Sequence, residues 1–299
     1  YYFNDAERFE KLRTGYLAHI ENMFNLAGLK DGKAAAETIM ALETKLAGFH
    51  WTKVESRDST KRYNKFDVAD LNTVTDAFNW TAYLAAQGVA AQKDLIINQP
   101  SFVKGFGETF AATSLADWKT YLTFHTLSNF ASSLTTALDN ENFDFYSKQL
   151  SGRKEQRPMW KRGVAVVNGN LGEVIGKVYV GRHFKPEAKT RMTQLVENLR
   201  GAYGASIDEL EWMSDTTKKA AHVKLASFDP KIGYPNKWED YSALVIKSDD
   251  LVGNGMRSGA VAHQKEVAKL GGPIDRQEWG MTPQTVNAYY NPTKNEIVF

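Results

Sequence analysis

Apolar residues recur every three or four positions through the first two-thirds of this chain, and this spacing constrains the fold more than any other feature. The first such stripe comprises Ala6, Phe9, Leu12, Tyr16, Ile20, Met23 and Ala27. Residues spaced in this way lie on one face of an α-helix, so the segment is predicted to form a long amphipathic helix. Gly28 follows as a helix stop, because glycine readily adopts the left-handed conformation that ends many helices.

Further helices are predicted from the same spacing and from residues that begin helices. A second stripe comprises Ala35, Ile39, Leu42, Leu46 and Phe49. Ser114 and Ser214 stand where helix N-caps are expected, and Pro186 stands just inside the start of another helix, where its missing N–H does no harm. Many helices with short polar connections indicate an α-helical architecture rather than an α/β one.

The C-terminal part of the chain changes in character. Gly253, Gly255 and Gly259 interrupt the periodicity and are interpreted as loop residues, with one helix expected around 261–270. Strand-like segments at 285–290 and 296–299 flank a turn-rich spacer, which predicts a β-hairpin. Because a lone hairpin is marginally stable, its sheet is expected to be completed elsewhere.

Composition excludes several classes of protein. The 37 Lys+Arg and 35 Asp+Glu give a formal net charge of +2, so there is no basic footprint for nucleic acid or for an anionic membrane. No apolar run approaches the ~20 residues of a membrane-spanning helix. The chain has no cysteine and therefore no disulfide, thiolate ligand or cysteine nucleophile. We expect neither a nucleic-acid partner nor a membrane span in this chain.

Metal-binding and nucleophile motifs are incomplete. None of the six histidines stands in an H-E-x-x-H frame, and the nearest helical pair is His263 with Glu266. Catalytic zinc usually takes three protein ligands, so we assign no metal ligand and favour a structural or solvent role for this pair. His125 lies on an apolar helix face and is interpreted as a satisfied core histidine. There is no G-x-S-x-G motif, and carboxylate pairs such as Glu239-Asp240 are interpreted as solvated, so no catalytic residue is assigned.

The segment 286–290 combines an alternating pattern with a carboxamide beside a small residue. An edge strand of this kind can bind an extended peptide through its main chain. The Asn287 carboxamide could add one donor and one acceptor, and the small Ala288 would allow close approach. From the pattern alone an ordinary structural strand is the favoured interpretation, because most strands are structural, and the peptide-binding interpretation stays open beside it.

The motifs of this segment extend the comparison to a known family. The run Trp279–Pro292, closing with Asn295–Phe299, closely resembles a signature of the neprilysin-like zinc metallopeptidases, which include neprilysin, the endothelin-converting enzymes and bacterial oligopeptidase O. Further matches follow the family's order along essentially the whole chain and include Pro158–Arg162, Gly169-Asn170, Gly176–Val180, Leu210–Ser214 and Lys231–Pro235.

This resemblance implies a fold and a set of binding residues. It implies a mainly α chain, with a helical lid and linker helices over 1–240 and a loop-rich segment over 241–299. That segment would end in a β-hairpin belonging to a thermolysin-like catalytic domain. The family's asparagine–alanine–aromatic–tyrosine strand binds the substrate backbone. The resemblance therefore implies that Asn287 and Ala288 bind substrate and that Tyr289 and Tyr290 support the strand.

The departures from the family pattern are equally informative. The sequence lacks the family's H-E-x-x-H helix and its later glutamate zinc ligand. The resemblance therefore implies part of a zinc endopeptidase that hydrolyses oligopeptides, with the zinc and the catalytic residues on a missing segment. This chain alone is expected to bind no zinc and to be inactive. Gly163 stands where animal members often carry a cysteine, which favours a bacterial protein, expected to be extracytoplasmic (periplasmic or cell-envelope) rather than cytoplasmic.

The alternative is a non-catalytic helical module that binds peptides or acts as a scaffold. Against it stands the predicted hairpin, which would leave sheet edges and the apolar Ile297, Val298 and Phe299 without partners in this chain.

Overall fold

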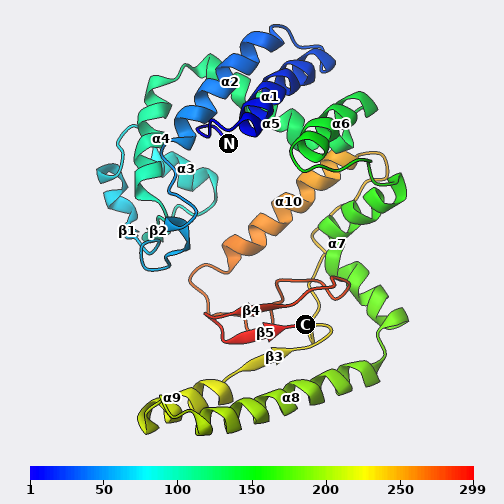
Figure 1. The fold of residues 1–299 in the computed structure, drawn as a ribbon. Coiled ribbons are helices and arrows are strands. Elements are labelled where there is room, and N and C mark those ends of the chain that lie inside the picture. The colour runs from blue at the N-terminus through cyan, green and yellow to red at the C-terminus, as the bar shows by residue number, and fades with distance from the viewer. The chain divides into compact units, whose positions relative to one another are not determined.

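The computed structural model describes residues 1–299, and the chain is mainly α-helical, as predicted (Figure 1). It divides into two compact units, Tyr1–Gln156 and Arg157–Phe299. The boundary predicted at residue 240 separates parts by their expected role rather than by their packing, and it stays a prediction. No helix combines the length and the apolar character needed to cross a bilayer.

The first unit contains six α-helices, four short helical segments and two strands. They are α1 (Glu7–Leu26), α2 (Gly32–Ala47), η1 (Glu55–Arg57), β1 (Lys65–Asp67), η2 (Val68–Thr73), α3 (Trp80–Ala86), β2 (Asp94–Ile96), α4 (Pro100–Ala112), α5 (Leu115–Phe130), η3 (Ala131–Ser133), α6 (Thr136–Asn142) and the π-helix η4 (Phe143–Gln149). Helix α1 ends before Gly28, which has the left-handed φ of 70° expected of a stop. Ser114 caps α5 by accepting a hydrogen bond from the Asp117 amide, as predicted.

The core of the first unit lies among α1, α2, α5 and η4. Its fully buried side chains include Ile20, Met23, Ile39 and Phe124. A smaller cluster forms around Leu71 beside the antiparallel pair β1–β2.

One carboxylate lies inside the larger core. Glu43 accepts hydrogen bonds from the hydroxyls of Tyr2 (2.8 Å) and Tyr16 (3.0 Å), and it lies 2.9 Å from Nε2 of His125. These partners offset the cost of removing a carboxylate from water. His125 is thus a satisfied histidine, as predicted, although its side chain is one-third exposed.

The second unit contains four α-helices and one small sheet. They are α7 (Met159–His183), α8 (Pro186–Glu209), α9 (Asp215–Ala226), β3 (Asp229–Lys231), α10 (Leu251–Ala268), β4 (Tyr289–Asn291) and β5 (Glu296–Val298). Pro186 begins α8 and Ser214 caps α9, as predicted. Helix α7 is interrupted at Leu171, whose φ of −135° and ψ of 38° are not helical. The strand order is β3-β5-β4, with β5 parallel to β3 and antiparallel to β4.

Two sequence-based predictions about this unit are wrong. Residues 253–259 do not form a loop, because α10 begins at Leu251. The helix tolerates its glycines because Asp250 accepts from the Gly253 amide and the Arg257 guanidinium contacts the Asp250 carboxylate. The C-terminal strand does not lack partners either: β5 is the central strand, and Val298 is completely buried.

Candidate functional site

The hairpin β4–β5 is present and forms one margin of the candidate site. Its register pairs Tyr289 with Val298 and Asn291 with Glu296. Asn295 closes the turn with a left-handed φ of 51°, a conformation that asparagine tolerates better than most residues. Because β5 is central, β4 is an edge strand of the sheet and its outer side is unpaired. This is the arrangement that strand addition by a peptide requires.

The predicted binding residues Asn287 and Ala288 lie just before this edge strand. The β-ladder begins at Tyr289, two residues after Asn287, so the predicted strand at 285–290 starts later than expected. Both residues are exposed, as is Val286. The Ala288 amide donates to Oδ1 of Asn287 at 2.8 Å, and the Asn287 amide donates to the Thr285 carbonyl at 3.0 Å. We call residues 285–288 the edge segment.

The edge segment borders a cavity of about 560 Å³, which we call the strand-edge groove. Its lining residues are Glu173, Glu239, Tyr241, Trp279, Gly280, Met281, Thr282, Thr285, Asn287, Ala288 and Tyr289. The Tyr289 hydroxyl accepts a hydrogen bond from the Gly280 amide at 2.9 Å. This contact closes the loop that carries the edge segment and fixes its downstream end.

The structure brings three of the four predicted site residues to this groove and separates the fourth. Asn287, Ala288 and Tyr289 line it together, whereas Tyr290 lines another cavity, of about 550 Å³, beside α8 and α9. There the Tyr290 ring stacks on Phe228, with ring centroids 6.3 Å apart. Successive side chains of a strand point to opposite faces, which accounts for the separation.

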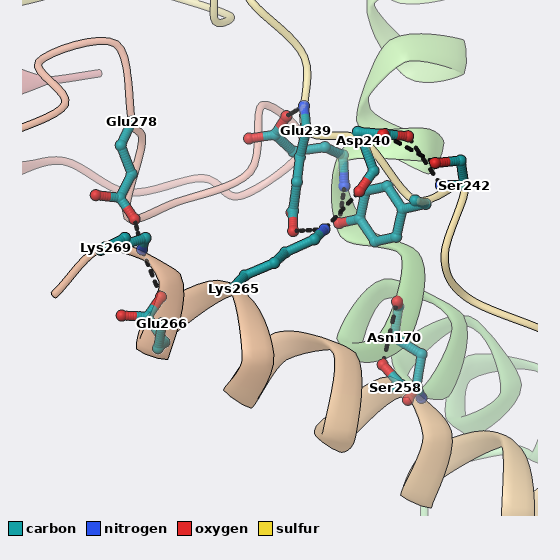
Figure 2. Close-up of polar contacts among 11 residues, drawn as sticks. Asn170, Glu239, Asp240, Ser242, Ser258, Lys265, Glu266, Lys269 and Glu278 are labelled. Atoms are coloured by element: carbon teal, nitrogen blue, oxygen red, sulfur yellow. Dashed lines mark hydrogen bonds and ion pairs between the residues drawn. The ribbon is translucent and has the colours of Figure 1, made fainter. Parts of the chain in front are cut away.

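A polar network borders the groove and joins α7, α10 and the loop between β3 and α10 (Figure 2). Lys265 of α10 contacts the Glu239 carboxylate and the Asp240 carbonyl. The Glu239 amide in turn donates to Glu173 of α7 at 2.6 Å. Glu239 is exposed, as its interpretation as a solvated carboxylate requires, but it is held by this network and lines the groove.

The network also perturbs its titratable groups. Burial raises the pKa of Glu173 above its usual range, and it raises the pKa of Tyr241 to about 12. Lys269 contacts both Glu266 and Glu278, and its hydrogen bond to Glu278 lowers the pKa of that carboxyl. Two carboxylates, Glu173 and Glu239, therefore line the groove, and Lys265 of α10 holds the second of them.

The residues present do not assemble a zinc site. No group of three or more His, Cys, Asp or Glu side chains lies close enough together to hold a metal ion. His263 and Glu266 both lie on α10, where Glu266 contacts Lys269. A catalytic zinc centre needs about three protein ligands, which this pair cannot supply.

Comparison with known proteins identifies the chain's family. The model of peptidase family M13 matches residues 1–235. The chain belongs to peptidase family M13. The resemblance found in the sequence is thus confirmed. Similarity to individual relatives continues past residue 235, where the family match ends. Human endothelin-converting enzyme 1 is 28% identical to the chain over 316 aligned positions, which cover 100% of this chain and 40% of that enzyme.

Two solved structures have the same fold as this chain. The zinc metalloprotease Zmp1 of Mycobacterium tuberculosis, solved with an inhibitor, is 44% identical, with a TM-score of 0.93. The alignment covers 100% of this chain and 46% of Zmp1. PepO of Lactobacillus rhamnosis shares the fold, with a TM-score of 0.87 at 22% identity. The chain therefore spans less than half the length of the relatives it matches.

Sequence reasoning missed several residues of the groove. Glu173 and Tyr241 carried no motif, and they come to the groove from segments far from the edge segment in sequence. Tyr241 accepts a hydrogen bond from the Glu173 amide at 3.3 Å, a contact that only the folded chain reveals. The one available signal was the aromatic and carboxylate density of 238–241, which is also common in exposed loops.

Proposed function

We propose that this chain is the N-terminal and lid portion of a zinc-dependent endopeptidase that hydrolyses oligopeptides. Residues 1–240 would form the lid and linker helices that restrict the size of substrates, and 241–299 would contribute the substrate-binding edge of a thermolysin-like catalytic domain. One observation carries the proposal: in an M13 chain, Asn287 and Ala288 lie exposed beside the open edge of β4 and a groove of about 560 Å³.

The edge segment would bind a peptide backbone by extending the β4 edge. In the free protein the Ala288 amide donates to the Asn287 side chain. A bound peptide would replace this internal bond, since its carbonyl would accept from Ala288 and its backbone would bond the freed carboxamide. Ala288 has no side chain beyond Cβ, so the two main chains can approach closely. Tyr289 would hold the edge in place through its bond to Gly280.

Zinc and its ligands would belong to the rest of the enzyme, because the residues of this chain do not form a metal centre. We accordingly propose that the 299-residue chain is inactive alone. An extracytoplasmic bacterial location would suit a peptidase of this kind.

The test is peptide hydrolysis by the full-length protein. A quenched fluorescent oligopeptide should be cleaved, cleavage should stop when zinc is chelated, and added zinc should restore it. Asn287→Ala should lower kcat/KM roughly tenfold, as expected for the loss of one or two hydrogen bonds to substrate. Asn72→Ala alters an exposed asparagine of η2 and serves as the matched control.

Two results would refute the proposal. Equal kcat/KM for the Asn287 and Asn72 variants would show that Asn287 does not bind substrate. Peptide binding without any zinc-dependent cleavage would favour the alternative of a non-catalytic peptide-binding or scaffold module.

A further inference from the structure

Helix α7 carries a notch formed by two glycines, into which the loop before the edge segment packs. Gly172 and Gly176 are the buried residues of α7 and lie four positions apart, on one face of the helix. A Cβ on Gly172 would lie 2.8 Å from Cγ2 of Thr282. A Cβ on Gly176 would lie 2.9 Å from both Cδ of Pro283 and Oε1 of Gln284. Side chains at these two positions would therefore displace the loop.

Gln284 fastens the loop in this glycine notch. Its Nε2 donates to the Gly172 carbonyl at 2.9 Å and to Oδ1 of Asn168 at 3.2 Å. Both acceptors lie on α7, one on each side of the interruption at Leu171. Oε1 of Gln284 is buried without a hydrogen-bond partner, so the two N–H bonds are what orient this carboxamide.

Gln284 stands next to the edge segment, so its contact with α7 bears on how that segment is held. It immediately precedes the edge segment, whose side chains are exposed. Of these, the Thr285 hydroxyl lies 2.9 Å from the Thr282 hydroxyl of the preceding loop. Downstream, the segment is held by the β4–β5 ladder and by Tyr289. Upstream, its first residue is tied to the loop, because the Thr285 amide donates to the Thr282 carbonyl at 3.0 Å. The edge segment is thus a short span fixed at its two ends.

We infer that Gln284 is a positioning residue for the edge segment, acting from the glycine notch of α7. Its carboxamide fixes where the edge segment starts, and so where Asn287 and Ala288 face the strand-edge groove. The effect on catalysis rests on the proposed function, whereas the positioning itself is a property of the free protein. Gln284 does not touch the groove and is not assigned any contact with substrate.

Two substitutions test this inference, each with a matched control. Gln284→Glu keeps the shape of the side chain but replaces both N–H donors with an oxygen that faces two acceptors. Gly176→Ala places a methyl group against Pro283 and Gln284. The controls are Gln264→Glu on the exposed surface of α10 and Gly181→Ala in α7, where a Cβ would meet nothing within 4 Å.

The first readout is amide hydrogen exchange in the full-length protein, which does not depend on activity. Both test variants should speed exchange in residues 285–289 roughly tenfold, while β5 and the rest of α7 stay unchanged. Both controls should match the unmodified protein. Because the two changes act on one contact, the double variant should exchange little faster than either single variant.

The second readout is the kinetics of peptide cleavage. A displaced edge segment should raise KM several-fold with a smaller change in kcat. Unchanged exchange at 285–289 in Gln284→Glu would overturn the inference, as would equal effects of Gly176→Ala and Gly181→Ala. A protein that cleaves no peptide but shows the predicted exchange would refute the proposed function and leave the positioning role supported.

Discussion

The buried ion pair between Lys231 of β3 and Glu296 of β5 offers a quantitative test of how the hairpin is anchored. Nζ of Lys231 lies 2.6 Å from Oε2 of Glu296, and the two side chains are only 7% and 2% exposed. Lys231 also donates to the Glu278 carbonyl at 2.8 Å. The pair therefore ties the parallel strands β3 and β5 to the loop that leads to the groove.

Removing one partner should cost far more than removing both. Lys231→Met leaves the Glu296 carboxylate buried without its cation, which typically costs about 3–5 kcal/mol. Glu296→Gln should cost about 1.5–3 kcal/mol, because an amide oxygen can still accept from Lys231 and the Glu278 carbonyl remains in place. The double change Lys231→Met with Glu296→Leu buries no charge and should restore most of the stability.

The assay is urea unfolding of the purified chain, with amide exchange of residues 296–299 reporting on the second unit specifically. With Glu296→Leu as the second single variant, the double-mutant cycle should give a coupling energy of about 3 kcal/mol. Lys65→Met, which breaks the exposed pair with Asp94, should leave the unfolding midpoint almost unchanged. A Lys231→Met protein as stable as the unmodified one would show that the buried pair does not anchor the hairpin, as would a double variant no more stable than that single variant.

Two further predictions concern pH. Burial lowers the pKa of His19 below its ordinary value near 6.5, against the opposing effect of Glu141, so the unfolded chain binds this proton more readily. The first unit should therefore lose stability as pH falls below that value. Urea unfolding at about pH 7.5 and about pH 5.5 measures this loss, and it should be smaller in His19→Phe. An equal change in the free energy of unfolding with pH in the two proteins would contradict the prediction. The hydrogen bond from Arg257 holds the pKa of Asp250 below its usual range near 3.8, so its stabilisation of α10 is present above that pH and is lost as pH falls through the lower folded value. Asp250→Ala should speed amide exchange in the first turn of α10, whereas Asp249→Ala, which alters an exposed neighbour, should not. Equal exchange rates in the two variants would show that Asp250 does not cap the helix.

The helices could be predicted where the signals were local. The stripe of α1 repeats every three or four residues, and the Ser114 and Ser214 caps and Pro186 act in the first turn of their helices. The structure has all of these helices as expected. The start of α10 was missed because its glycines were weighed without the cap at Asp250. A local rule for glycine was thus overridden by a specific side-chain contact.

The non-local features could not be predicted in the same way. Strand β3 contains Pro230, a residue that argues against a strand, and its partner β5 lies more than sixty positions away. The glycines of α7 weaken its helical periodicity. Nothing in the sequence indicates that the loop before the edge segment packs against two of them, Gly172 and Gly176. The family resemblance supplied Asn287 and Ala288, but it did not indicate that Tyr290 would line a separate cavity.

The most direct test of the account is the footprint of a bound peptide on the full-length protein. Amide exchange would be measured with and without a saturating oligopeptide analogue that resists cleavage. We expect slower exchange at Ala288 and along β4 when the analogue is bound, and the loss of this protection in Asn287→Ala. Saturation with the analogue while residues 285–291 exchange at the same rate as in the free protein would contradict it.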